Sequence, residues 1–221
     1  MASPEKSYPG GIMGRYTLYG RYGWGSVLSE AQLDWYGLAF DFVDTGDLFE
    51  DAKAREKLAR LNPLAQVPVL ILPDGQVMTE SAAITLHLAD AAASHDLVPE
   101  PDDPARVLFL RWLIFIVANI YPTFTYADVP GRFVPGEKAA KDFRANVDDY
   151  QKKLWSIVEA EARAPWFLGA RFSALDVYLA IMTRWRPNRP WFEENAPKLM
   201  AGADRCSELA KLKPVLLRNY P

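Results

Sequence analysis

Two periodicities alternate along the first ninety residues. Short apolar or aromatic runs, which are typical of strands, cover four segments: 15–20, 39–43, 68–72 and 77–79. Helices are predicted over three others. Apolar residues have helical spacing in 26–36, the polar and charged segment 51–60 is typical of a surface helix, and Ser81 opens a helix over 81–92. The pattern therefore predicts the order strand, helix, strand, helix, two strands, helix.

Glycines mark two of the predicted turns. Gly37 follows the first helix and supplies the left-handed residue with which helices often end. Asp74-Gly75 separates the last two strands and is a strong signal for a tight hairpin. The first strand, helix and strand are joined so closely that they predict a right-handed crossover with parallel strands. This order is the thioredoxin-like arrangement, an α+β domain that we expect over residues 15–92.

The remainder of the chain is predicted to be helical. From residue 104 no strand-like alternation appears, and helices are predicted over 104–120, 137–162 and 173–185. The first of these is apolar nearly all round, so we expect it to be buried between other elements. We interpret 93–103, which is rich in proline and charge, as a linker to an all-helical domain over 104–221. Residues 1–14, rich in glycine and proline, are predicted to be a disordered lead-in.

Composition narrows the function classes. Half of the 221 residues are apolar and 24% are charged, which suits a globular protein with large cores. The chain has a single cysteine, Cys206, so an internal disulfide is excluded. It has only two histidines, His87 and His95, so a zinc site is not expected. These counts suit a reducing, cytoplasmic environment.

Charge and hydropathy argue against two kinds of partner. The net charge of −3 is not that of a nucleic-acid-binding protein, which normally carries a basic face. The apolar run at 113–118 is far shorter than the ~20 residues that span a bilayer, so no membrane partner is expected. Residues 1–14 also lack the apolar segment of a secretory signal.

Two sequence motifs resemble those of the glutathione transferase superfamily. The first is Asn62 to Leu70 (NPLAQVPVL), followed after the hairpin by Thr79 to Ile84 (TESAAI). The second is Phe167-Leu168-Gly169, followed by Ser173 to Asp176 (SALD). Their order and spacing also fit, so the resemblance covers almost everything after Gly14. It implies the glutathione transferase architecture, a thioredoxin-like domain followed by helices. Ser173 to Asp176 is also a helix capping box, and its structural role is the better interpretation.

The resemblance implies a glutathione site made by the first motif. It identifies Val67-Pro68 as a cis peptide, with Gln66 beside it and the Val67 backbone pairing with the cysteinyl part of glutathione. The plainer interpretation is a proline that opens an edge strand. Glu80 and Ser81 would hold the γ-glutamyl end, while Ser81 could equally be an ordinary N-cap; we expect it to do both.

The group that activates the thiol is less evident in the sequence. Members of the family that use serine or cysteine carry it at positions that correspond here to Gly23 and Gly25. Ser26, the nearest hydroxyl at the predicted helix start, is our candidate catalytic residue, with an ordinary N-cap as the equal alternative. The fallback candidates are Tyr22 and Tyr19. A cysteine mechanism is excluded, because Cys206 lies in the last helical segment.

Aromatic and apolar residues of the first C-terminal helix are candidates for the pocket of the second substrate, although at helical spacing they could simply be core. They are Trp112, Phe115, Ile116 and Tyr121, with Phe124 and Tyr126 nearby. A basic cluster at Arg184, Arg186 and Arg189 could attract an acidic ligand, but a solvated face is the plainer interpretation.

The hypothesis from the sequence is a cytosolic glutathione transferase that joins glutathione to a small hydrophobic electrophile through a stabilised thiolate. The resemblance implies a homodimer and no metal or bound cofactor, with glutathione as co-substrate. Two alternatives remain open. One is a non-catalytic binding or scaffold protein of the same fold. The other is a glutathione-dependent isomerase or ether-cleaving relative.

Overall fold

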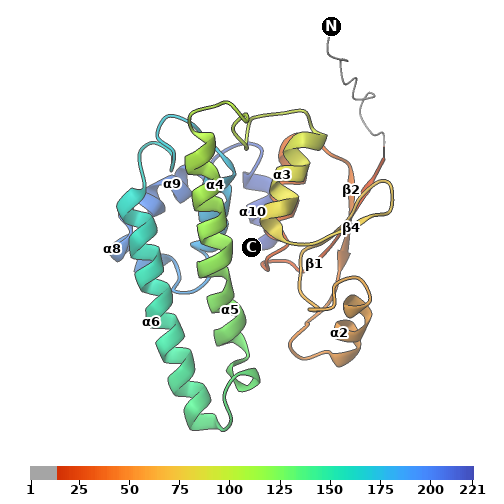
Figure 1. Ribbon diagram of the computed structural model, residues 1–221, viewed down its shortest axis with the longest axis vertical. Coiled ribbons are helices and arrows are strands. Elements are labelled where there is room, and N and C mark those ends of the chain that lie inside the picture. Colours follow the sequence, from red (N-terminus) through yellow and green to blue (C-terminus); the bar gives the residue numbers. More distant parts are fainter. Residues whose placement is uncertain (1–13) are drawn as a thin grey trace, which may run out of the picture.

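The computed structural model describes residues 14–221, so the predicted lead-in lies, apart from Gly14, outside the described residues. The first part contains a four-stranded sheet, which lies beside the helical part in Figure 1. The strand order is β2-β1-β3-β4. Its strands are β1 (Tyr16–Gly20), β2 (Phe40–Asp44), β3 (Val69–Ile71) and β4 (Val77–Met78). β1 and β2 are parallel, whereas β3 is antiparallel to both β1 and β4.

Helices cover both faces of this sheet. They are α1 (Val27–Tyr36), α2 (Ala52–Ala59) and α3 (Ser81–Ala91). Because side chains alternate along a strand, Leu18 and Leu70 pack with α1 and α3, while Tyr19 and Val69 pack with α2 on the other face. The element order and the mixed sheet confirm the predicted thioredoxin-like arrangement.

The second part of the chain is helical, as predicted. Its α-helices are α4 (Arg106–Phe115), α5 (Tyr121–Asp128), α6 (Glu137–Glu161), α7 (Ala174–Met182), α8 (Arg189–Asn195), α9 (Pro197–Ser207) and α10 (Lys213–Asn219). A π-helical turn, η1 (Ile116–Ile120), joins α4 to α5, and a short 3-10 turn, η2 (Pro130–Arg132), follows α5.

The first helix of this part runs further than predicted. α4, η1 and α5 form one continuous stretch of 23 residues, Arg106–Asp128, instead of ending at residue 120. Pro122 would clash with the carbonyl group of a regular α-helix four residues earlier, and the wider π turn just before it accommodates the ring. By length and composition alone this stretch could cross a membrane, which the run at 113–118 did not indicate. In the fold its inner face is buried, through Phe109, Trp112 and Leu113 among others.

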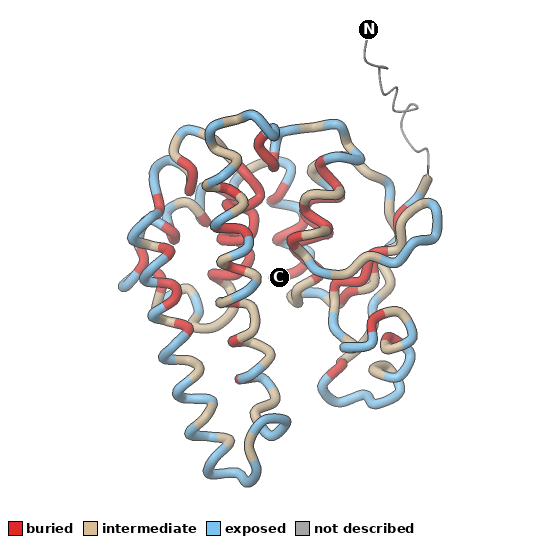
Figure 2. Tube along the Cα trace, viewed as in Figure 1, coloured by how far each residue is buried: buried red, intermediate tan, exposed pale blue. Residues whose placement is uncertain are grey.

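One hydrophobic cluster is shared by the two parts, beside two smaller clusters within the sheet domain. Val27, Leu28 and Ala31 of α1 lie in the same buried cluster as residues of α4, α7 and α9. Buried residues gather along α3, the upper part of α4 and the inner helices, while the lower half of α6 is exposed or half-buried (Figure 2). The continuous core fixes α1 and the loop before it against the helical part, where the cavities described next are found.

Candidate functional site

Two adjoining cavities lie between the sheet domain and α5. The aromatic cavity, of about 360 Å³, is bounded by the loop 23–25, residues 48–49, α5 and Trp185. The α3 cavity, of about 380 Å³, is bounded by the loop 62–68, the start of α3 and the other side of α5. Both are lined by the same four residues: Gln66, Val67, Tyr121 and Thr125.

The α3 cavity brings together all five residues that the sequence assigned to glutathione. They are Gln66, Val67, Pro68, Glu80 and Ser81. The Val67–Pro68 peptide is cis, which confirms that part of the prediction. Residues from two segments more than ten positions apart thus line one wall of a single cavity.

Asn62 holds the loop that carries Gln66 and Val67. Its buried side chain donates from Nδ2 to the Gln66 carbonyl oxygen (2.9 Å) and accepts at Oδ1 from the Leu64 N–H (3.1 Å). Ala65, between them, has a left-handed backbone with φ +49°. The loop is therefore fixed by its own hydrogen bonds, with no dependence on a ligand.

The N-terminus of α3, the positive end of the helix dipole, lies at one end of the α3 cavity. Glu80 precedes the helix with φ +65°, a conformation rarely taken by residues other than glycine. Ser81 is the first helical residue, one position later than the predicted cap, and N–H groups of a first helical turn have no partner within the helix. A carboxylate at this point would meet unpaired N–H donors and the positive end of the helix dipole.

A buried hydrogen-bond chain connects this helix start to the helical part. Thr85 Oγ1 donates to the Ser81 carbonyl oxygen (2.9 Å), accepts from Gln32 Nε2 (3.0 Å) and lies 3.2 Å from the Tyr178 hydroxyl. Burial raises the pKa of Tyr178 to about 12, so the hydroxyl stays protonated. The chain holds α1, α3 and α7 in fixed relation around Ser81.

The structure corrects the assignment of Ser26 as the thiol-activating residue. Its side chain is fully buried and lines neither cavity. The hydroxyl turns back into its own loop, accepting from the Arg21 N–H (3.0 Å) and donating to the Arg21 carbonyl oxygen (3.1 Å). It also makes no side-chain cap for α1, so Ser26 braces the loop and is not available to a ligand.

The two fallback tyrosines also lie away from the cavities. Tyr22 is exposed, and its ring stacks on Phe42 with centroids 4.9 Å apart. Tyr19 packs against the small core under α2. Neither tyrosine lines the aromatic cavity or the α3 cavity.

The loop at the mouth of the aromatic cavity is clamped from the far end of the chain. Trp185 Nε1 donates to the Gly23 carbonyl oxygen (2.9 Å). Asn219 Oδ1 accepts from the Gly23 N–H (3.0 Å), and its Nδ2 donates to Glu30 (2.9 Å). Gly23 has φ +76°, which suits glycine, and both of its backbone polar groups are satisfied by this clamp.

Gly25 has no room for a side chain because of Tyr121. A Cβ atom on residue 25 would collide with the Tyr121 hydroxyl and would lie 3.2 Å from the Val67 carbonyl oxygen. Within residues 14–221, this buried hydroxyl has no hydrogen-bond partner. Burial raises the pKa of Tyr121 far above its ordinary value, so the group stays neutral and protonated.

Of the four residues predicted to line the second-substrate pocket, the structure brings only Tyr121 to the cavities. Trp112 and Ile116 are fully buried in the helical core, and Phe115 packs edge-on against Trp112. Of the two aromatic neighbours, Phe124 lines the aromatic cavity and Tyr126 the α3 cavity. The helical spacing alone did not show which face of the helix turns toward the sheet domain.

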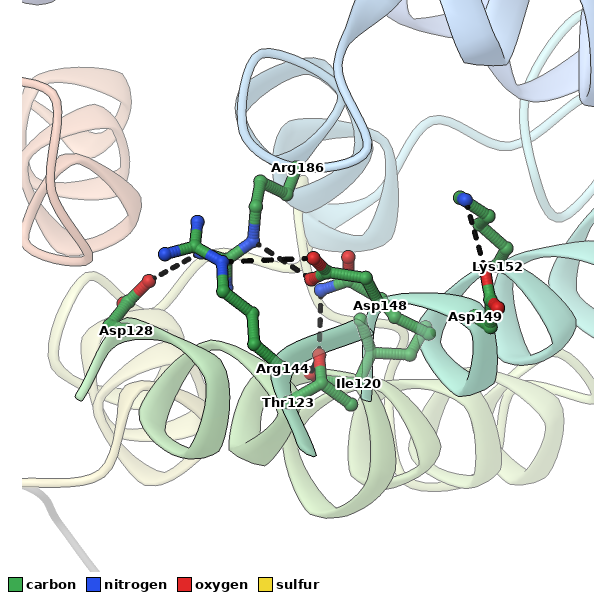
Figure 3. A network of polar contacts seen from close by, with 9 residues as sticks. Ile120, Thr123, Asp128, Arg144, Asp148, Asp149, Lys152 and Arg186 are labelled. Atoms are coloured by element: carbon green, nitrogen blue, oxygen red, sulfur yellow. Dashed lines mark hydrogen bonds and ion pairs between the residues drawn. The ribbon is translucent and has the colours of Figure 1, made fainter. Parts of the chain in front are cut away.

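The remaining wall of the aromatic cavity is held by a polar network, shown in Figure 3. Arg186 pairs with Asp128 of α5 (2.6 Å) and Asp148 of α6 (3.3 Å), and Arg144 reaches the same Asp148 (3.8 Å). Of the predicted basic cluster, Arg186 alone lines a cavity. Arg184 hydrogen-bonds to Ser207, and Arg189 pairs with Asp204.

No group of three or more His, Cys, Asp or Glu side chains that could hold a metal ion occurs within residues 14–221. The site offers instead backbone donors, one buried hydroxyl and two aromatic-lined walls. Such an arrangement can bind a small anionic peptide beside an apolar molecule.

Comparison with known proteins gives a consistent result. The glutathione S-transferase N-terminal domain family matches residues 31–91. The chain is 40% identical over 203 residues to the "uncharacterized GST-like protein YncG" of Escherichia coli K12, covering 91% of this chain and 97% of that protein. It is 29% identical to the glutathione S-transferase GstA of Escherichia coli O157:H7, over 72% of this chain and 77% of that protein.

Solved structures resemble the chain over almost its whole length. A glutathione transferase homologue from Sulfitobacter, with bound glutathione, covers 92% of this chain and 97% of its own, with a TM-score of 0.78 at 23% identity. A sphingomonad enzyme complexed with glutathione covers 91% and 97%, with a TM-score of 0.74 at 25% identity.

Proposed function

Because this chain belongs to the glutathione transferase superfamily, we propose that it binds glutathione and transfers it to a small hydrophobic electrophile. The protein then needs no bound cofactor, and glutathione is its co-substrate. We propose a cytoplasmic location, in keeping with the single buried cysteine.

The gathering of all five predicted residues on the α3 cavity carries this proposal. The α-carboxylate of the γ-glutamyl group would accept from the free N–H groups at the start of α3, beside Ser81. Glu80 would accept from the adjoining amino group. Val67 lines both cavities, and its backbone would pair with the cysteinyl residue, whose thiol would then lie where the two cavities adjoin.

The aromatic cavity supports the class of the second substrate. Trp24, Phe49, Phe124 and Trp185 line it, and at about 360 Å³ it has the size of a small-molecule site. It adjoins the α3 cavity at Val67 and Tyr121, so an electrophile held there would meet the glutathione sulfur. Proximity of this kind is a large part of what such an enzyme supplies.

Calorimetric titration with reduced glutathione tests the binding step. We expect a dissociation constant of about 1 mM or lower for the wild type, and at least about tenfold weaker binding for Glu80→Ala/Ser81→Ala. Glu161→Ala, an exposed glutamate at the end of α6, is the control and should bind like the wild type. A wild-type protein that releases no heat with glutathione contradicts the proposal.

Turnover of 1-chloro-2,4-dinitrobenzene, followed by the absorbance of its glutathione conjugate, tests the transfer step. Conjugation above the uncatalysed rate supports the transferase function. Binding without conjugation of this or other aromatic and alkyl halides would point instead to a binding protein of the same fold.

We also propose that the protein is a homodimer. Val107, Leu110 and Ile114 form one apolar stripe along α4, at positions three and four residues apart, with Leu110 half-buried between the two exposed residues. Val107 is 78% exposed and Ile114 is 50% exposed, which is unusual for a line of aliphatic side chains. A second copy of the chain would cover this stripe.

A further inference from the structure

We propose that the Tyr121 hydroxyl, supplied by the helical part of the chain, donates a hydrogen bond to the sulfur of bound glutathione. It thereby takes the place of the hydroxyl that the loop 21–26 does not offer. This inference rests on the proposed function and adds a catalytic residue to it.

The geometry around Gly25 is the first argument. The space into which a Gly25 side chain would project is occupied by the Tyr121 hydroxyl on one side and bounded by the Val67 carbonyl oxygen on the other. Val67 is the residue proposed to pair with the cysteinyl backbone of glutathione. The Tyr121 hydroxyl therefore lies beside the cysteinyl position, opposite the loop where the family carries its own residue.

The state of the hydroxyl is the second argument. It is buried and has no hydrogen-bond partner among the described residues, although a buried hydroxyl normally finds one. Its environment keeps it protonated, so it can donate but does not compete for the proton of the thiol. Tyr121 lines both cavities, so a neutral donor without a partner stands at the wall that they share and is suited to an incoming anion.

The way the ring is held is the third argument. Trp185 and Phe124 pack edge-on against Tyr121, with centroids 5.9 Å and 6.1 Å away. Trp185 is in turn fixed by its bond to the Gly23 carbonyl oxygen. Tyr121 also directly follows the π turn η1, and such turns recur at functional sites. The hydroxyl is therefore positioned before any ligand arrives.

The chemical role follows from the charge on sulfur. The glutathione thiol loses its proton to solvent, and the thiolate accepts the O–H of Tyr121 in a charge-assisted hydrogen bond. The sulfur lone pair then forms the S–C bond, and the leaving group departs with the bonding electron pair. Because the hydrogen bond is made to the anion, it lowers the pKa of the bound thiol.

Tyr121→Phe is the direct test. We expect glutathione affinity within about threefold of the wild type, because a single hydrogen bond near the sulfur contributes little to binding of the whole tripeptide. The pKa of the bound thiol, read from the ultraviolet absorbance of the thiolate against pH, should rise by about one unit, and kcat/KM at neutral pH should fall roughly 10- to 100-fold. Tyr150→Phe, on the exposed side of α6, is the matched control and should change neither value.

A rescue experiment separates catalysis from packing. Gly25→Ser places a Cβ against the Tyr121 hydroxyl and should impair turnover by displacing it. In Gly25→Ser/Tyr121→Phe the hydroxyl that collides is gone, the next contacts are 3.2 Å and 3.4 Å, and the new serine restores a donor. We expect the double variant to be more active than either single variant. Exceeding Gly25→Ser shows only that the collision is relieved, whereas exceeding Tyr121→Phe requires the new serine donor, and a double variant no more active than Tyr121→Phe would contradict the proposal.

The outcomes distinguish this proposal from the one on which it rests. If the wild type binds and conjugates glutathione, and the pKa of the bound thiol is the same in Tyr121→Phe, the role of Tyr121 is overturned and the transferase function still stands. A wild type that binds glutathione without lowering its thiol pKa also overturns it. A wild type that does not bind glutathione at all removes both.

Discussion

Ala65 shows how one residue of the glutathione loop is held in an unfavourable conformation. Its φ of +49° lies in the left-handed region, where the Cβ of any residue other than glycine is crowded. The loop nevertheless takes this shape, because the Asn62 side chain bonds to both Leu64 and Gln66 around it. The loop hydrogen bonds thus offset a local cost at this position.

We therefore expect Ala65→Gly to raise the free energy of unfolding by about 1 kcal/mol. Urea unfolding measures it. Ala92→Gly is the control and should lower the free energy of unfolding. Ala92 has an ordinary helical φ of −81°, so glycine there only adds flexibility to the unfolded chain. Equal changes in the two variants would contradict the argument.

Single residues were predictable from sequence where their role is local. The capping box at Ser173 is confirmed, with Asp176 accepting from the Ser173 N–H (2.9 Å), and so is the cis peptide before Pro68. Ser26 was misassigned because its hydroxyl is consumed by Arg21, within a loop whose shape depends on residues at the other end of the chain.

At the scale of elements, α10 acts as a latch on the loop 21–25. Asn219 accepts from the Gly23 N–H and donates to the buried Glu30 of α1, and Arg218 pairs with the same Glu30 (2.6 Å). No pattern within residues 21–30 indicates that such a partner exists. The loop conformation, and with it the aromatic cavity, is set by a contact between segments nearly two hundred residues apart.

Asn219→Ala should therefore act on both stability and the site. We expect a loss of about 2 kcal/mol in the free energy of unfolding, because it leaves the part-buried Gly23 N–H and one oxygen of the buried Glu30 carboxylate without their partner. The KM for the electrophile should rise as Trp24 and Gly25 lose their fixed position. Thermal unfolding and steady-state kinetics measure the two effects, with Asn146→Ala on the exposed face of α6 as the control. A stability loss with unchanged KM would confine the latch to a structural role.

Helix and strand boundaries were predicted correctly where a residue at the boundary determines them, and wrongly where the rest of the fold does. The hairpin and the helix ending at Gly37 lie where the sequence predicts them, since glycine determines each turn through its own backbone. The helix from Arg106 was predicted to end at residue 120, before Pro122, but the π turn η1 lets it continue to Asp128. That continuation carries Tyr121 and Phe124 toward the sheet domain, and so decides which aromatic residues reach the cavities.

At the scale of the whole molecule, the uncovered stripe on α4 is the feature to test. Ile114→Asp should convert the proposed dimer into monomers, because it buries a charge in an apolar interface. Sedimentation velocity measures the mass. Ile157→Asp is the matched control, since Ile157 is an equally exposed isoleucine on α6, outside the stripe. A monomeric wild type, or a dimer unaffected by Ile114→Asp, would contradict the assignment of this face.

The tight contact between Gly25 and the Tyr121 hydroxyl also determines the order in which substitutions at these two positions can be accepted during evolution. A side chain at position 25 collides with the hydroxyl, so while the tyrosine is present selection holds that position at glycine. If the tyrosine is first replaced by phenylalanine, the collision disappears and position 25 becomes free to vary. The two codons are therefore coupled, and among descendants of this chain a serine at position 25 should arise only after the tyrosine has gone.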